Sequence, residues 1–301
     1  QIFDFDNDGR QDLFVTDMHS DMSQGVIPNK EKEKADIQWG EDILQTGGGS
    51  LFGNAFYRSL GEGKYEEISD KIGAENYWPW GLSSGDLNAD GFTDVFITSS
   101  MNFPFRYGVN SLLLNVEGKR FADSEFILGV EPRREGRTAK PWFKVDPQGE
   151  DQGNKFVEEL DLKEPTEIWG ALGSRSSAIF DIDNDGDLDV VTNEFHDGPM
   201  VMRSNLSEQL GEKLNWLGVK LVGSKSNRDG LGSVVKVTAG GKIFTQVNDG
   251  VSGYLSHSLI PLYFGLGEAA EVEKIEVTWP SGEQLVVEGL ELGKTHTIEE
   301  Q

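Results

Sequence analysis

The sequence contains no cysteine among its 301 residues, and it has only four histidines. Without cysteine the chain can form neither a disulfide framework nor a thiol-based active site or zinc site. No apolar run reaches the roughly eighteen residues that a membrane-spanning helix needs. The few histidines leave few places for acid–base catalysis or for a transition-metal site.

Basic residues are also scarce, because 27 Lys and Arg stand against 52 Asp and Glu, for a net charge of −25. This charge argues against nucleic acid and anionic membranes as partners, since both are themselves polyanions. An acidic composition is typical of disordered chains as well, but seven Trp and seventeen Phe indicate a packed core. The length allows either one large repeat domain or two domains.

The most informative stretch runs from Ser177 to Phe195, where two apolar segments flank a nine-residue acidic loop, 181–189. Aspartates occupy loop positions 1, 3, 5 and 9, and Gly186 occupies position 6, where a sharp bend disfavours a Cβ. Calcium binds about six to eight oxygens, and alternate residues of a tight turn can direct theirs at one point. An EF-hand would need a Glu at position 12, where Thr192 stands, and flanking helices. The stretch therefore predicts a calcium loop within a β-hairpin.

The same pattern recurs at residues 4–12 and 86–94. A metal-free, solvated Asp/Gly turn would explain a single copy, but three copies with the same ligand positions favour calcium. We expect three Ca²⁺ sites, each formed by the side chains at positions 1, 3, 5 and 9 and the backbone carbonyl at position 7. The predicted ligands are Asp4, Asp6, Asp8, Arg10 and Asp12 in the first loop, Asp86, Asn88, Asp90, Phe92 and Asp94 in the second, and Asp181, Asp183, Asp185, Asp187 and Asp189 in the third.

A larger unit repeats around each loop, and the loop starts lie 82 and 95 residues apart. Strand patterns precede and follow each loop, and glycine-turn hairpins follow at 54–68 and 110–123. Insertions at about 18–53 and 131–165 interrupt the repeat. Periodic four-stranded units are typical of β-propeller blades, and each blade needs its neighbours to complete a core.

The D-x-D-x-D-G-x-x-D loops resemble those of FG-GAP/VCBS repeats in integrin-α-like propellers, over residues 1–207. The resemblance implies that each calcium loop links two strands of one blade, on the face away from the usual ligand surface. Known propellers of this kind have about seven blades, whereas the sequence has three such units. We therefore expect that further blades precede Gln1 or that another chain closes the ring. The start at Gln1, without methionine, indicates a mature or truncated product.

Residues 215–301 follow a different pattern, in which alternating Val, Lys and Thr segments between glycine turns predict a small antiparallel β-domain. Its motifs are N-R-D-G-L-G at 227–232, Y-F-G-L-G at 263–267 and V-T-W-P-S-G at 277–282. Their order resembles that of the ASPIC/UnbV domain, which ends proteins of the cartilage acidic protein family and its bacterial relatives. The absence of cysteine departs from the animal members and favours a bacterial-type homologue.

His19 and His196 each stand seven residues after the last aspartate of their loop, which predicts equivalent strand ends at the pole opposite the calcium loops. Because both histidines have acidic neighbours, they could form a polar-ligand site or a catalytic metal site. The other interpretation is that they are exposed to solvent or hydrogen-bonded to loops. Because Met101 holds the equivalent place in the unit between them, we expect no His–His or His–carboxylate metal cluster. Aromatic groups around Trp80 and Tyr107, near the same pole, could line a carbohydrate or peptide site or pack the inserted loops.

The sequence therefore predicts an all-β protein, with FG-GAP/VCBS propeller blades followed by a small ASPIC/UnbV β-domain. We expect a secreted calcium-binding repeat protein that acts in extracellular binding, adhesion or structural assembly. Exposed loops of this kind bind calcium at about 10⁻⁴–10⁻³ M, which favours an extracellular or cell-surface location. The expected partner is a protein or glycan ligand, or further copies in an oligomer or filament. The alternative is an extracellular enzyme with a site near His19 and His196.

Overall fold

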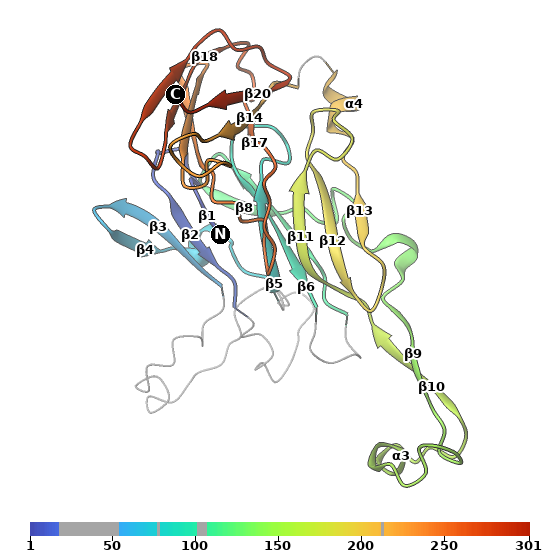
Figure 1. Ribbon diagram of the computed structural model, residues 1–301. Coiled ribbons are helices and arrows are strands. Elements are labelled where there is room, and N and C mark those ends of the chain that lie inside the picture. The colour runs from blue at the N-terminus through green and yellow to red at the C-terminus, as the bar shows by residue number, and fades with distance from the viewer. Residues whose placement is uncertain (18–53, 77–78, 101–106, 212–213) are drawn as a thin grey trace.

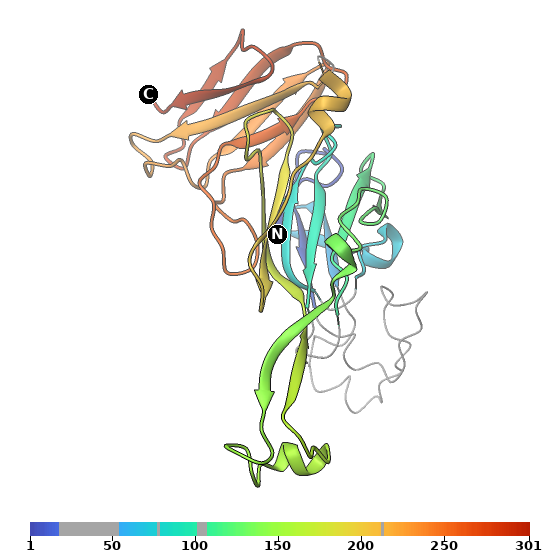
Figure 2. The ribbon, with the colours of Figure 1, turned by 90° about the vertical axis from the view of Figure 1, so that its right-hand side faces the viewer.

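The computed structural model describes residues 1–17, 54–76, 79–100, 107–211 and 214–301. Strands dominate these residues, and the helices are short, which confirms the all-β prediction. In Figure 1 the N-terminal sheets stand side by side, the C-terminal domain covers one end of them, and a two-stranded arm extends from the other end. Figure 2 shows the same arrangement from the side.

Two four-stranded antiparallel sheets form the first two blades. The first blade has the order β1-β2-β3-β4 and contains β1 (Ile2–Phe3), β2 (Asp12–Val15), β3 (Ala55–Gly61) and β4 (Lys64–Glu67). The second has the order β5-β6-β7-β8 and contains β5 (Pro79–Gly85), β6 (Asp94–Ser99), β7 (Ser111–Val116) and β8 (Arg120–Asp123). Each aspartate loop connects two paired strands, and the hairpins predicted after the first two loops are present.

The third blade has three strands rather than the four that the repeat predicts. They are β11 (Gly173–Phe180), β12 (Asp189–Phe195) and β13 (Met200–Met202), in that order. After β13 the chain enters the short helix α4 (Leu206–Leu210) and passes to the C-terminal domain. In the described residues, the third blade therefore ends at β13, and the connection to the C-terminal domain begins there.

The insertion at about 131–165 forms most of a projecting arm. The arm pairs β9 (Ala139–Val145) with β10 (Thr166–Ala171) in antiparallel register and holds α3 (Lys155–Glu159) at its tip. A 3₁₀ turn, η3 (Arg134–Gly136), precedes it. The other short helix, α2 (Ser69–Ile72), follows the first blade and ends at Gly73, whose φ of 71° suits glycine.

The middle blade is buried on both faces, because side chains alternate across a strand and blades flank it on both sides. Val95 and Ile97 on β6 join a cluster with the first blade, whereas Phe96 between them joins a cluster with the third blade. The first of these clusters is rich in aromatic rings, and Phe56 and Phe121 meet there in an edge-to-face contact at 6.1 Å. The blades are therefore joined by packing across their faces.

The C-terminal domain consists of two sheets around a separate core. One sheet has the order β17-β14-β20 and contains β14 (Trp216–Val222), β17 (Leu262–Gly265) and β20 (Lys294–Glu299). The other has the order β16-β15-β18-β19 and contains β15 (Val234–Ala239), β16 (Lys242–Val247), β18 (Val272–Thr278) and β19 (Gln284–Val287). The pairings are antiparallel as predicted, except that β14 and β20 run parallel. The parallel pair joins the first and last strands of the domain.

Candidate metal centres

The three aspartate loops have the same backbone conformation. Position 4 is left-handed in each, with φ of 55° at Asn7, 56° at Ala89 and 60° at Asn184. Position 6 is a glycine with φ of 84°, 92° and 98° at Gly9, Gly91 and Gly186. Because only glycine adopts this conformation at little cost, the glycine at position 6 fixes the bend that brings the aspartates together.

The first aspartate of each loop accepts hydrogen bonds from two backbone N–H groups of its own turn. Asp4 accepts from Asp8 N at 3.1 Å and from Gly9 N at 2.9 Å. The same two bonds occur in the other loops, to Asp86 from Asp90 N at 3.1 Å and Gly91 N at 2.8 Å, and to Asp181 from Asp185 N at 3.2 Å and Gly186 N at 2.9 Å. These bonds hold the first carboxylate over the centre of the turn.

The last aspartate joins each loop to the rest of its blade. Asp12 accepts from Phe5 N at 2.9 Å within the loop and from Ser59 N at 2.7 Å on the third strand. Asp94 accepts in the same way from Leu87 N and Asn115 N, and Asp189 accepts from Ile182 N and Ser204 N. Position 9 is thus occupied by a buried carboxylate that couples loop geometry to the sheet.

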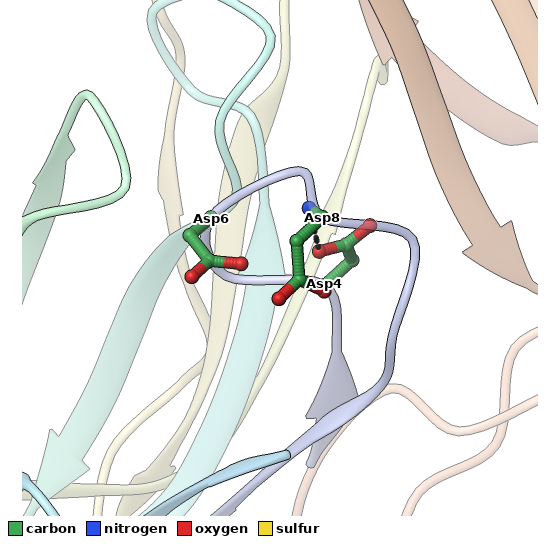
Figure 3. Close-up of side chains that lie close together, drawn as sticks. All are labelled: Asp4, Asp6 and Asp8. Carbon is green, nitrogen blue, oxygen red and sulfur yellow. Dashed lines mark hydrogen bonds between the residues drawn. The ribbon is translucent and has the colours of Figure 1, made fainter. Parts of the chain in front are cut away.

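Carboxylate oxygens crowd together in the first and third loops. Oxygens of Asp4, Asp6 and Asp8 lie within 4.8 Å of one another, and Figure 3 shows the three side chains gathered around the turn. Asp6 Oδ1 is buried and has no hydrogen-bond partner. Burial and the neighbouring carboxylates of Asp8 and Asp6 raise the pKa of Asp4 to about 7. A cation among these oxygens would relieve that crowding, so the residues present fit a metal ion.

The second loop has one amide among its donors. Burial, together with the charge of Asp90, raises the pKa of Asp86 to about 8. Burial also raises the pKa of the fully buried Asp94 well above its usual range. Asn88 donates its Nδ2 hydrogen to Asp90 Oδ2 at 3.0 Å. Unlike the other two loops, this loop has no set of three carboxylates whose oxygens all lie within 4.8 Å of one another. It still offers three carboxylates and an amide oxygen, which is a suitable donor set for a hard cation.

In the third loop, oxygens of Asp181, Asp183 and Asp189 lie within 4.8 Å of one another. A second group in this loop contains Asp185, Asp187 and Glu208, the last of which belongs to α4. Sequence reasoning missed Glu208, because it lies after the repeat unit and outside the loop pattern. Basic side chains partly offset this charge, since Arg203 lies 3.2 Å from Asp183 in the third loop and Arg58 lies 2.5 Å from Asp6 in the first.

At the opposite pole, the structure describes one of the two predicted histidines. His196 Nε2 lies 3.3 Å from the carbonyl of Pro141, and its ring contacts Trp142 at 5.7 Å between centroids. The neighbouring Asp197 pairs with Arg137 at 2.6 Å and with Lys140 at 3.0 Å. His19 and its acidic neighbour Asp21 lie outside the described residues, as do Met101, Trp78, Phe103 and Phe105.

A buried polar network near the same pole was not predicted. Arg133 forms an ion pair with Glu194, and its Nε donates to the hydroxyl of Tyr107 at 2.8 Å. Tyr107 donates to Glu131 at 2.8 Å, and Ser174 donates to Glu194 at 2.8 Å. The network ties the base of the arm to the second and third blades. Its members are far apart in the sequence, so no local pattern marks them.

The C-terminal domain packs directly on the second and third loops. The hydroxyl of Tyr263 donates to the carbonyl of Gly186 at 2.9 Å, and Gly267 N donates to the carbonyl of Ala89 at 3.0 Å. A cavity of about 640 Å³ lies between this domain and the first strands of the blades, and Asp181 and Asn184 are among its lining residues. The third loop is therefore part of the interface and also lines this cavity.

The segment between β16 and β17 extends this interface along β5 (Figure 1). Ser83 Oγ on β5 lies 2.9 Å from the carbonyl oxygen of Ser252 and 2.8 Å from that of Ser177 on β11, so its one hydrogen has an acceptor on either side. A Cβ at Gly253 would lie 2.9 Å from Ser83 Oγ and 3.0 Å from the Ser177 carbonyl. The close approach of this segment to two blades therefore depends on glycine.

Among the residues that the structure describes, no helix combines the length and the apolar character needed to cross a membrane. No curated protein sequence matches the chain. Residues 4–97 match the family model of the FG-GAP-like repeat, a repeat typical of extracellular or surface proteins, and residues 223–301 match that of the ASPIC and UnbV domain. These matches agree with the blades, the aspartate loops and the separate C-terminal core described above. The chain is thus an FG-GAP-repeat β-propeller protein that carries an ASPIC/UnbV domain.

Proposed function

We propose that this chain is a calcium-stabilised binding module of a secreted or cell-surface protein, with one Ca²⁺ in each of the loops 4–12, 86–94 and 181–189. The observation that carries the proposal is the shared geometry of the three loops. Each has positive φ at positions 4 and 6 and the same carboxylate-to-backbone hydrogen bonds, although the residues at positions 2, 7 and 8 differ. A turn without a ligand has no need to keep four oxygen donors at fixed positions.

The donor set favours calcium over other cations. Each loop offers carboxylate, amide or carbonyl oxygens and neither histidine nor cysteine, which argues against zinc and copper. Magnesium prefers a strict octahedral site with several waters, whereas calcium accepts a larger and less regular set of oxygens. The side chains at positions 1, 3, 5 and 9 and the carbonyls of Arg10, Phe92 and Asp187 would supply those oxygens.

The place of the loops in the fold suggests what the ions would do. Positions 1 and 9 are already tied to the backbone, so a cation would mainly neutralise the repulsion among carboxylates that burial brings together. Two of the loops also contact the C-terminal domain. We propose that the chain divides into domains at 1–207 and 215–301, and that calcium makes their contact rigid.

The function that the packed sheets and the projecting arm favour is extracellular binding or assembly. It is a scaffold of packed sheets with an inserted arm at one pole, and its charge of −25 suits neither nucleic acid nor an anionic membrane as partner. The partner is a protein or glycan ligand, or further copies of the chain. The enzymatic alternative draws no support from His196, whose ring packs against Trp142.

The test is a calcium titration of the 1–301 chain by calorimetry, together with thermal unfolding in chelator and in excess calcium. We expect three ions per chain and a higher melting temperature with calcium, because a hundredfold excess over Kd contributes about 2.7 kcal/mol for each site. Asp183→Ala should reduce the count to two, since it would remove an ion ligand whose other contact in the described chain is an ion pair with Arg203. The control is Glu271→Ala, which removes the same charge from an exposed turn.

A melting temperature that is the same in chelator and in calcium would overturn the proposal. An unchanged ion count in Asp183→Ala would remove the third loop as a site. Retention of three ions in Glu271→Ala is required before a loss in Asp183→Ala is attributed to the loop.

A further inference from the structure

A row of aromatic rings and one guanidinium crosses the molecule from the C-terminal domain to the arm. We call it the aromatic strip and define it as Tyr254, Trp80, Arg175, Phe195 and Trp142. The rings of Tyr254 and Trp80 are 5.8 Å apart, and those of Phe195 and Trp142 are 6.1 Å apart. Between them, the Arg175 guanidinium lies 3.8 Å from the Trp80 ring and 4.9 Å from the Phe195 ring. Each contact is short enough to make the strip continuous.

The two ends of the strip are open to solvent. Trp142 on β9 is 38% exposed, and Tyr254 in the segment between β16 and β17 is 41% exposed. The three inner members, on β5, β11 and β12, are partly buried. The rings of Trp142 and Tyr254 are therefore open to a ligand at the two ends, and the strands hold the partly buried inner members between them.

The Arg175 guanidinium lies between two aromatic rings, those of Trp80 and Phe195. Within the described ranges it has no carboxylate partner, and its Nε is buried without a hydrogen-bond acceptor. Burial lowers the pKa of this guanidinium, and the interaction with Tyr254 raises it by a smaller amount. Arg120 also lacks a carboxylate partner there, but it is exposed to water on β8. The chain has 52 acidic residues, yet none of those described pairs with this half-buried guanidinium. Because a buried charge without a partner is costly, an anion from outside the chain would stabilise it.

The chemistry of the strip indicates which anion. A guanidinium binds a carboxylate through two parallel N–H···O bonds. Aromatic faces carry partial negative charge, and the C–H groups on one face of a pyranose ring carry partial positive charge, so the two stack. We propose that the aromatic strip binds an acidic saccharide, with Arg175 pairing with a uronate carboxylate and the rings of Trp142 and Tyr254 stacking against sugar rings.

A saccharide suits the strip better than an acidic peptide does. The strip offers one cation and four rings, whereas a run of Asp or Glu side chains would need several cations and would leave the rings unused. The inference deepens the proposed function, because it names the ligand class of the proposed binding module. It concerns residues outside the calcium loops, so the two proposals can fail separately.

The experiment measures binding of a linear oligoglucuronate to the 1–301 chain by calorimetry and tryptophan fluorescence. Its methyl ester, which keeps the rings and removes the charge, is the matched ligand. We expect Arg175→Gln to weaken oligoglucuronate binding at least about tenfold, as expected for loss of one charge-assisted contact, and to leave ester binding unchanged. Trp142→Ala should weaken both ligands by a similar factor. Arg120→Gln, the matched control for charge, should bind both as the parent does.

Binding that depends on Arg175 and Trp142 in this pattern supports the inference. Absence of oligoglucuronate binding, equal binding of acid and ester, or preference for polyglutamate over oligoglucuronate overturns it. If Arg175→Gln is less stable, the comparison of acid with ester and the Trp142→Ala variant still decide the question. Asp183→Ala should bind oligoglucuronate normally, and this result supports the saccharide site whether or not the loops bind calcium.

Discussion

Gly186 lies so close to the indole of Trp216 that a Cβ at this glycine would be 2.3 Å from Trp216 Nε1. The contact joins the third aspartate loop to the first strand of the C-terminal domain. Trp216 cannot easily yield, because its ring is stacked on Tyr263 at 5.6 Å. Gly186 therefore serves two purposes, because it forms the bend of the third loop and leaves room for the indole of Trp216 at the interface between the domains.

We predict that Gly186→Ala lowers stability more than Gly9→Ala does. Both glycines have positive φ, 98° and 84°, so both variants carry a backbone strain of about 1–2 kcal/mol. A Cβ at Gly9 meets nothing within 4 Å, whereas at Gly186 it meets Trp216. Denaturant unfolding in excess calcium measures the free energy of each variant. Equal losses would mean that the packing of Trp216 on the loop contributes nothing.

A second prediction separates the structural role of the loop aspartates from metal binding. Asp94→Ala leaves the N–H groups of Leu87 and Asn115 without their acceptor. It should therefore cost about 2–4 kcal/mol even in chelator, where no calcium can bind. Asp183→Ala, which removes only a contact with Arg203, should cost less than about 1 kcal/mol there. Similar losses for the two variants in chelator would contradict the assigned roles.

The buried pair of Arg133 and Glu194 gives a third prediction. Arg133→Met leaves the Glu194 carboxylate buried without its cationic partner, which should cost about 3–5 kcal/mol of unfolding free energy. Arg137→Met removes an exposed pair with Asp197 and should cost about 1 kcal/mol or less. Adding Glu194→Gln to Arg133→Met should recover part of the loss. A double variant less stable than Arg133→Met alone would show that the charge of Glu194 is not the cause.

Glu300 gives a prediction for pH. Its carboxylate accepts from the N–H groups of Ser224, Lys225 and Ser226 at 2.8, 2.8 and 2.6 Å and from the hydroxyl of Ser281 at 2.6 Å. Burial alone would raise the pKa of Glu300, but these hydrogen bonds outweigh burial and lower it to about 2.

Because the folded-state pKa is depressed, the stabilisation is present above the ordinary value of 4.5 and is lost as pH falls toward about 2. Glu300→Gln should therefore be less stable than the parent chain at pH 6, and the difference should shrink steadily below pH 4.5. Urea unfolding across this range measures it. A difference that does not change with pH would show that the charge of Glu300 is unimportant.

Much of the fold follows from local patterns in the sequence. The hairpin strands on either side of Asp86 and Asp94 were predicted because turn chemistry and alternation of apolar residues act within a few residues of the chain. The glycine at position 6 predicted the bend of each loop, and the structure has that bend in all three. The calcium ligands themselves remain a prediction.

Other features depend on residues that are distant in the sequence. Nothing near Trp216 indicates that its indole packs on Gly186, and nothing near Arg175 indicates that Trp80 and Phe195 lie on either side of it. The third blade was predicted to have four strands, but after β13 the chain turns into α4, where Ser207 N donates to Asp187 at 2.6 Å. These features are determined by packing between elements that are distant in the sequence, so local sequence patterns do not predict them.

The parallel pairing of β14 and β20 determines how the C-terminal domain responds to force. Leu217 stands opposite Lys294 and Val222 opposite Glu299, so the strand that enters the domain and the strand that ends it run side by side in one direction. Tension between the blades and the C-terminal end would act along both strands in shear. The hydrogen bonds of the ladder would then share the load instead of opening one at a time.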